Sequence, residues 1–133
     1  MTFLKKILLV DCEPRVTAVV RKALEATGKY MIKEERDSRH TLNAARWFQP
    51  DLILLDVPMS HPDGERVTRQ LRADRSFLDT PLVFLSMDTS SEGGVASGGM
   101  VSGYSFSATP VPIQELVRYV AELLNPAAEQ SKA

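Results

Sequence analysis

Three short runs of apolar residues divide this chain, and each of them ends at a polar residue. They cover residues 7–10, 52–55 and 82–85, and they are followed by Asp11, Asp56 and Ser86. A continuous apolar run of this length between turn signals is typical of a strand buried on both faces of a parallel sheet. Weaker alternation over residues 30–35 and 104–108 predicts two further strands. The pattern therefore predicts five strands.

Between these runs, apolar residues recur at spacings of three and four, which predicts amphipathic helices. The predicted helices begin near Pro14, near Ser38, at Gly64 and at Ile113, and they end near Leu24, Phe48, Arg72 and Leu124. Gly28 fits a C-terminal cap of the first helix, and Pro50 closes the second. Alternating strands and helices indicate an α/β domain over residues 1–125, with a parallel sheet covered on both faces, and a solvated tail at residues 126–133.

The segment between Met87 and Gly103 fits this scheme poorly. A parallel strand after it needs a crossover connection, which is normally a helix. Four glycines lie in the segment, at positions 93, 94, 98 and 99, and each costs about 0.8–1 kcal/mol relative to alanine inside a helix. We therefore expect the fourth helix to be short or irregular.

Composition narrows the function classes. The chain has 133 residues, of which 44% are hydrophobic and 25% charged, and its formal net charge is −1. It lacks the basic excess of a nucleic-acid-binding protein and any apolar run long enough for a membrane span. The N-terminal residues do not form a signal peptide, so we expect a cytoplasmic protein. The single Cys12 excludes an internal disulfide and a zinc site built from cysteines.

The polar residues at the strand ends are the candidate chemistry. Asp11, Asp56 and Ser86 are expected at one edge of the sheet, because the carboxyl ends of neighbouring parallel strands meet there and bind ligands. Two carboxylates at that edge repel each other unless a cation is present. Magnesium prefers oxygen ligands and often takes one or two carboxylates together with phosphate and water. An aspartate can itself form an aspartyl phosphate. These residues predict chemistry with phosphate and magnesium.

With these motifs in order, the sequence resembles the receiver domains of two-component response regulators, the family of the chemotaxis regulator. The landmarks are residues 7–14, residues 50–56, Asp63-Gly64, residues 81–86 and Thr109-Pro110. The resemblance covers about residues 4–125. It implies a doubly wound, flavodoxin-like sheet of five parallel strands in the order 2-1-3-4-5.

The resemblance also implies roles for individual residues. Asp56 matches the aspartate that accepts phosphate from a partner histidine kinase or phosphotransfer protein. Asp11 matches one of the paired acidic residues that bind magnesium, and Pro58 occupies the position whose backbone carbonyl binds the ion. Ser86 matches the hydroxyl residue that donates to the phosphoryl group. Phe106 matches the aromatic switch residue that turns inward upon activation.

The sequence departs from the family pattern at several positions, among them Pro58, Ser60 and Met87, and two further departures remove charged groups from the site. Cys12 replaces the second acidic residue, and a thiol is a poor ligand for a hard cation. Thr109 replaces the family lysine, so a neutral hydroxyl stands where an ammonium group would bind a phosphoryl oxygen. We therefore expect an atypical receiver that binds magnesium weakly or not at all, and in which phosphorylation of Asp56 is inefficient.

Two functions remain open at this point. The chain is either a phosphoacceptor signalling switch or a phosphorylation-independent interaction module on the same fold. A small phosphatase with Asp11 as its nucleophile is a third reading, which lacks an obvious catalytic lysine. We expect a signalling module rather than an enzyme, with a downstream protein target and no direct contact with nucleic acid or membrane. Homodimerisation is left open.

Other distinctive residues have ordinary explanations. Trp47 and Phe48 cannot both point inward on one helix, so we expect one in the core and the other partly exposed. His40 and His61 are expected at the surface, in a helix and in a loop respectively. Cys12 is expected to be a small buried thiol rather than a redox sensor.

Overall fold

The computed structural model describes residues 4–10, 14–56, 62–87, 95–101, 104–107 and 113–124. Within these residues a sheet of six strands has the order β2-β1-β3-β4-β5-β6. The strands are β1 (Lys5–Val10), β2 (Tyr30–Glu35), β3 (Leu52–Leu55), β4 (Leu82–Met87), β5 (Val95–Val101) and β6 (Tyr104–Ser107). The α-helices are α1 (Pro14–Glu25), α2 (Thr41–Phe48), α3 (Pro62–Arg72) and α4 (Ile113–Leu124), and two short 3-10 helices are η1 (Ser38–His40) and η2 (Arg75–Phe77).

The first four strands of the sheet are parallel, as the sequence predicted. β1 lies between β2 and β3, and β4 pairs with the other edge of β3, which gives the order 2-1-3-4. The apolar runs at residues 7–10, 52–55 and 82–85 are the buried parts of β1, β3 and β4. Their continuous apolar character follows from their central position, since side chains on both faces of these strands are covered.

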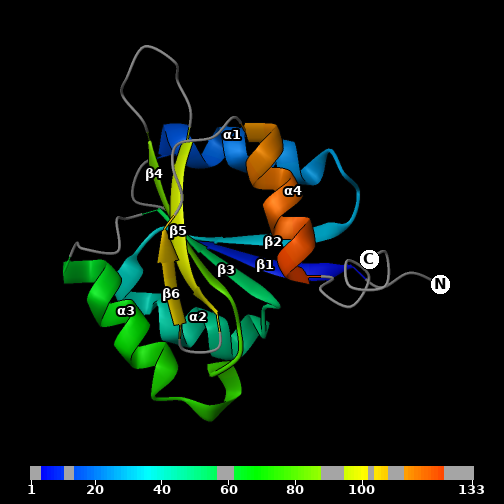
Figure 1. Cartoon of the computed structure of the whole chain (residues 1–133). Coiled ribbons are helices and arrows are strands. Elements are labelled where there is room, and N and C mark those ends of the chain that lie inside the picture. The colour runs from blue at the N-terminus through cyan, green and yellow to red at the C-terminus, as the bar shows by residue number, and fades with distance from the viewer. Residues whose placement is uncertain are drawn as a thin grey trace, which may run out of the picture.

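Helices cover the two faces of the sheet in pairs, with α1 and α4 on one side and α2 and α3 on the other (Figure 1). Ile7 and Leu9 of β1 pack in the core that includes α1 and α4. Leu8 and Val10 of the same strand pack in the core that includes α2, α3 and η2. Alternate residues of one strand therefore serve two separate cores.

The helix ends agree closely with the sequence signals. Gly28 follows α1 with φ of +71°, and its N–H donates to the Glu25 carbonyl at 3.0 Å, as expected of a C-terminal cap. α2 ends at Phe48 and is followed by the left-handed cap residue Gln49, just before Pro50. α3 begins at Pro62, two residues before the predicted start. Proline is favourable in a first turn, because its missing N–H has no partner there anyway.

The glycine-containing segment is the main correction to the predicted fold. Residues 95–101 form the strand β5 and not part of a crossover helix. β5 runs antiparallel to β4, with Leu82 opposite Met100. Residues 88–94 lie outside the described part of the chain. The two central glycines of β5 disfavour a helical conformation. Because an antiparallel strand needs only a short connection to its neighbour, no crossover helix is required. The described sheet therefore has six strands of mixed direction and not five parallel ones. The predicted last strand is present as β6, but it pairs with β5 and not with β4.

The neighbouring aromatic residues of α2 separate as expected. Phe48 is buried in the core beneath α2, whereas Trp47 is 76% exposed. The Lys33 ammonium of β2 lies 4.9 Å from the centre of the Trp47 ring, which is the geometry of a cation–π contact. His40 is exposed, as predicted. None of the described helices is long and apolar enough to cross a bilayer.

The two-sided core predicts a large difference between two identical substitutions. Val83 of β4 is fully buried, whereas Val19 of α1 is 51% exposed. Val83→Ala should lower the free energy of unfolding by about 2–3 kcal/mol, because it removes two buried methyl groups and leaves a cavity. Val19→Ala should change it by less than about 0.5 kcal/mol. Urea unfolding followed by circular dichroism measures both values, and equal losses would contradict this description of the core.

Candidate functional site

Asp56 lies directly after β3 at its carboxyl end. Asp56 is 7% exposed, whereas the four residues of β3 that precede it are completely buried. Its backbone N–H donates to the carbonyl of Val10, the last residue of β1, at 2.8 Å. The strand pairing thus fixes the backbone of Asp56 beside the end of β1.

Three strand ends meet at this edge of the sheet. Val10 is paired with Leu55, and Leu55 is paired with Phe84 of β4. β1 and β3 therefore end side by side, and Ser86 lies in β4 two residues beyond the Phe84 pairing. The predicted convergence of the ends of β1, β3 and β4 is confirmed for the backbone.

The remaining predicted site residues are described only in part or not at all. Asp11, Cys12, Pro58 and Thr109 lie outside the described residues. Ser86 and Phe106 lie in β4 and β6, and only their backbone is described. The roles assigned to these six residues therefore stay predictions.

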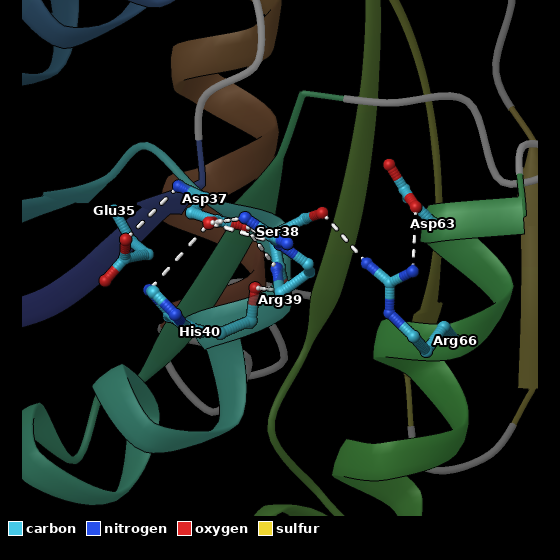
Figure 2. A network of polar contacts seen from close by, with 8 residues as sticks. Glu35, Asp37, Ser38, Arg39, His40, Asp63 and Arg66 are labelled. Carbon is cyan, nitrogen blue, oxygen red and sulfur yellow. Dashed lines mark hydrogen bonds and ion pairs between the residues drawn. The ribbon is translucent and has the colours of Figure 1, made fainter.

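A polar network occupies the turn between β2 and α2 at the same edge of the sheet (Figure 2). The Arg39 guanidinium donates to both carboxylate oxygens of Asp37, at 3.0 and 2.8 Å, and the Arg39 backbone N–H donates to the same carboxylate at 2.9 Å. These bonds hold the pKa of Asp37 well below its ordinary value. Their contribution to stability is complete above the ordinary carboxyl pKa and is lost as the pH falls below it.

Arg66 of α3 connects this turn to the start of α3. Its guanidinium donates to the Ser38 hydroxyl at 3.1 Å and to the Asp63 carboxylate at 2.9 Å. Ser38 is only 6% exposed, and its carbonyl accepts a bond of 2.7 Å from the hydroxyl of buried Thr41. Figure 2 shows Arg66 extending from α3 toward the turn.

This network joins two elements that lie beside Asp56 in the topology. The β2–α2 turn follows Glu35, which is paired with Val10, and α3 is the first described element after Asp56. The sequence marked Ser38 only as the approximate start of a helix and Asp63 only as a family landmark. The i,i+3 spacing of Asp63 and Arg66 was a usable signal. The Arg66–Ser38 bond joins residues 28 positions apart and had none.

The sequence matches a family profile over most of its length. The profile described as "Response regulator receiver domain" matches residues 7–118. The chain belongs to the response regulator receiver domain family. The resemblance noted from the sequence motifs is thereby confirmed.

Solved receiver domains share the fold. The signal receiver domain of a signal transduction histidine kinase from Syntrophus aciditrophicus is 24% identical and superposes with a TM-score of 0.68, covering 92% of this chain and 91% of that one. The receiver domain of the sensor histidine kinase PA1611 from Pseudomonas aeruginosa PAO1 is 22% identical with a TM-score of 0.69, covering 92% of this chain and 99% of that one. That structure has a magnesium ion coordinated in its active-site cleft.

Curated relatives are longer than this receiver chain. The response regulator MprA of Mycolicibacterium vanbaalenii is 32% identical over 120 residues, which are 90% of this chain and 50% of that protein. The response regulator Rre1 of Synechocystis is 29% identical over 123 residues, 89% of this chain and 51% of that protein. The receiver chain thus spans about half the length of these relatives.

The described part of this receiver contains no cluster of three or more histidine, cysteine, aspartate or glutamate side chains that could hold a metal ion. Asp56 is the one predicted metal ligand whose side chain lies among the described residues. The other predicted metal ligands, Asp11, Cys12 and Pro58, lie outside the described residues.

The Arg66 bridge predicts a measurable contribution to stability. Arg66→Ala removes the bonds to Ser38 and Asp63 and should lower the free energy of unfolding by about 1 kcal/mol. It should also increase hydrogen exchange at the amides of residues 38–41. Arg69→Ala is the matched control, since Arg69 is exposed on the same helix and should change stability by less than about 0.5 kcal/mol. If both variants behave alike in urea unfolding and in hydrogen exchange, the bridge does not stabilise the turn.

Proposed function

We propose that this chain is a receiver-type signalling module in which Asp56 is the phosphoacceptor position but phosphorylation is inefficient. The observation that carries the proposal is the place of Asp56, at the end of β3 where the ends of β1 and β4 meet. The phosphate donor in this proposal is the phosphohistidine of a histidine kinase or a phosphotransfer protein.

The transfer step needs only one protein nucleophile. A carboxylate oxygen of Asp56 attacks the phosphorus atom, the bond from phosphorus to the donor histidine breaks, and the imidazole leaves with its bonding electrons. The product is an aspartyl phosphate. Because the protein makes no further covalent bond, catalysis depends on positioning and on positive charge around the phosphoryl oxygens.

Most of the donor set fits magnesium, but one donor does not. The carboxylates of Asp11 and Asp56 and the backbone carbonyl of Pro58 are oxygen donors, which magnesium prefers. The thiol of Cys12 is a soft donor in the place of a carboxylate. A bound magnesium ion would supply charge neutralisation to the phosphoryl oxygens. With three suitable donors and one unsuitable one, we infer weak or absent binding.

Thr109 in place of the family lysine removes the positive charge of an ammonium group, in addition to the charge lost when magnesium binds weakly. The Thr109 hydroxyl can donate one hydrogen bond, but it cannot form a charge-assisted bond to a phosphoryl oxygen. In the proposed switch Ser86 donates to the phosphoryl group, and Phe106 changes orientation in response. The two losses, at Cys12 and Thr109, act in the same direction and favour a slow reaction.

The same two losses favour a second candidate function. A phosphorylation-independent module would keep the receiver fold as a docking surface for a downstream protein and would not need the missing charges. In either case we propose a signalling protein rather than an enzyme, and one that contacts its target through protein surfaces rather than through nucleic acid.

Phosphorylation by a small phosphodonor separates the two functions. Labelling with acetyl phosphate and magnesium should be slow and substoichiometric in the wild type, and Asp56→Asn should abolish it. The double variant Cys12→Asp/Thr109→Lys should react about 10- to 100-fold faster, because each change restores electrostatic stabilisation of the transferred group. Intact-protein mass spectrometry measures the label. Rapid stoichiometric labelling of the wild type at Asp56 contradicts the impaired site, and no labelling of the double variant contradicts the phosphoacceptor role.

Magnesium should stabilise a restored site far more than the native one. At 10 mM magnesium, a Cys12→Asp variant with a Kd of about 1 mM gains about 1.4 kcal/mol, which raises Tm by about 5 °C. The wild type should shift by less than about 1 °C. Thermal unfolding followed by circular dichroism measures the shift, and Cys12→Asp/Asp56→Asn is the control that should lose it. An equal shift in the wild type would show that the thiol does not weaken the site.

A further inference from the structure

A surface hollow lies between α2 and the end of α3, on the helical layer away from α1 and α4. It has a volume of about 430 Å³ and is lined by Leu42, Arg46, Gln70, Ala73, Asp74 and Arg75. We call it the α2–α3 hollow. Its residues come from α2, from α3, from the turn after α3 and from the start of η2. None of them belongs to the phosphoacceptor site.

The charges around the α2–α3 hollow are unequal. Asp74 is already engaged, because it accepts hydrogen bonds from Arg46 Nε at 3.1 Å and from the Ser76 backbone N–H at 3.0 Å. Arg75 is exposed, and no ion pair joins it to another described residue. The Asp74 carboxylate is therefore neutralised, whereas the Arg75 guanidinium has no ion-pair partner among the described residues. The hollow consequently favours an anionic group.

The interior of the α2–α3 hollow favours an apolar group. Leu42 is half-buried and contacts the core of the α2 and α3 face, and Ala73 presents a small apolar surface. The Gln70 side-chain carbonyl oxygen is buried, with no hydrogen-bond partner among the described residues. This oxygen is closed to solvent, so a bound segment would contact the apolar surface of Leu42 and Ala73 and not Gln70.

Nucleic acid fits this surface less well than protein does. A phosphate backbone would not fill an apolar hollow, and the chain as a whole carries a net charge of −1. The rim of the hollow is open, and the Arg46 side chain there is 59% exposed. Such a surface suits a peptide segment of a partner protein that lies across it.

From this combination we propose that the α2–α3 hollow is a docking site for a partner-protein segment that presents an apolar side chain flanked by carboxylates. The apolar side chain enters between Leu42 and Ala73, and a carboxylate pairs with Arg75. This surface is separate from the Asp56 edge and functions whether or not Asp56 is phosphorylated.

The test is an NMR titration of the full chain with a short synthetic peptide that carries one phenylalanine between glutamates. Saturable shifts with a Kd on the order of 0.1 mM are expected, confined to amides of residues 42–46 and 70–75. Arg75→Glu should weaken binding about tenfold, because attraction at the rim becomes repulsion. Ala73→Phe should block binding by filling the hollow. Arg118→Glu is the matched control, since Arg118 is an exposed arginine of α4 on the other side of the sheet and should bind as the wild type does.

Other outcomes would overturn the proposal. They are no saturable shift up to about 1 mM peptide, shifts centred on α4 or β6, and equal binding of a peptide with lysines in place of the glutamates. Stronger shifts with a 20-base-pair DNA duplex than with the acidic peptide would assign the surface to nucleic acid instead. Circular dichroism confirms that each variant is folded.

Discussion

The covering of β1, β3 and β4 on both faces is the constraint on which the rest of this structure depends. The side chains of residues 7–10, 52–55 and 82–85 in these strands are all apolar and buried, so neither face of this part of the sheet can meet water. Helices must therefore pack on both sides, and parallel strands joined through helices must all end at the same edge. The place of Asp56 follows from this constraint, because the residue after the buried strand β3 lies beside the ends of its neighbours β1 and β4. The backbone that carries this carboxylate is held in position by its pairing with β1.

In the proposed function, the position of this carboxylate and the charges around it have different physical origins. The backbone at Asp56 is fixed by strand pairing with the end of β1. The electrostatic field around the carboxylate, by contrast, depends on individual side chains, and single substitutions change it by a full charge each. A receiver can therefore lose chemical competence while its architecture remains intact. The polar network of Asp37, Ser38 and Arg66 belongs to the architectural part, because it joins secondary-structure elements without requiring a phosphoryl group.

Sequence reasoning succeeded where one strand or helix carries its own signal. The runs at residues 7–10, 52–55 and 82–85 predicted central strands, because burial on both faces leaves an unbroken apolar pattern. The glycines at 98 and 99 correctly argued against a regular helix, but a strand there requires pairing with β4, which no local pattern encodes. The choice between Trp47 and Phe48 likewise depends on which side of α2 faces the sheet. The Arg66–Ser38 bond and the α2–α3 hollow arise only when distant segments pack together.

The exposure of Trp47 has a consequence for studying this protein in solution. It is the only tryptophan in the chain, and its ring is already mostly in water in the folded state, held against Lys33. Unfolding therefore changes the surroundings of the indole little, and its emission maximum is a poor gauge of folding. The exposed ring can instead report association of another molecule at the β2 side of α2. A blue shift on mixing with another molecule would report that the ring has been covered.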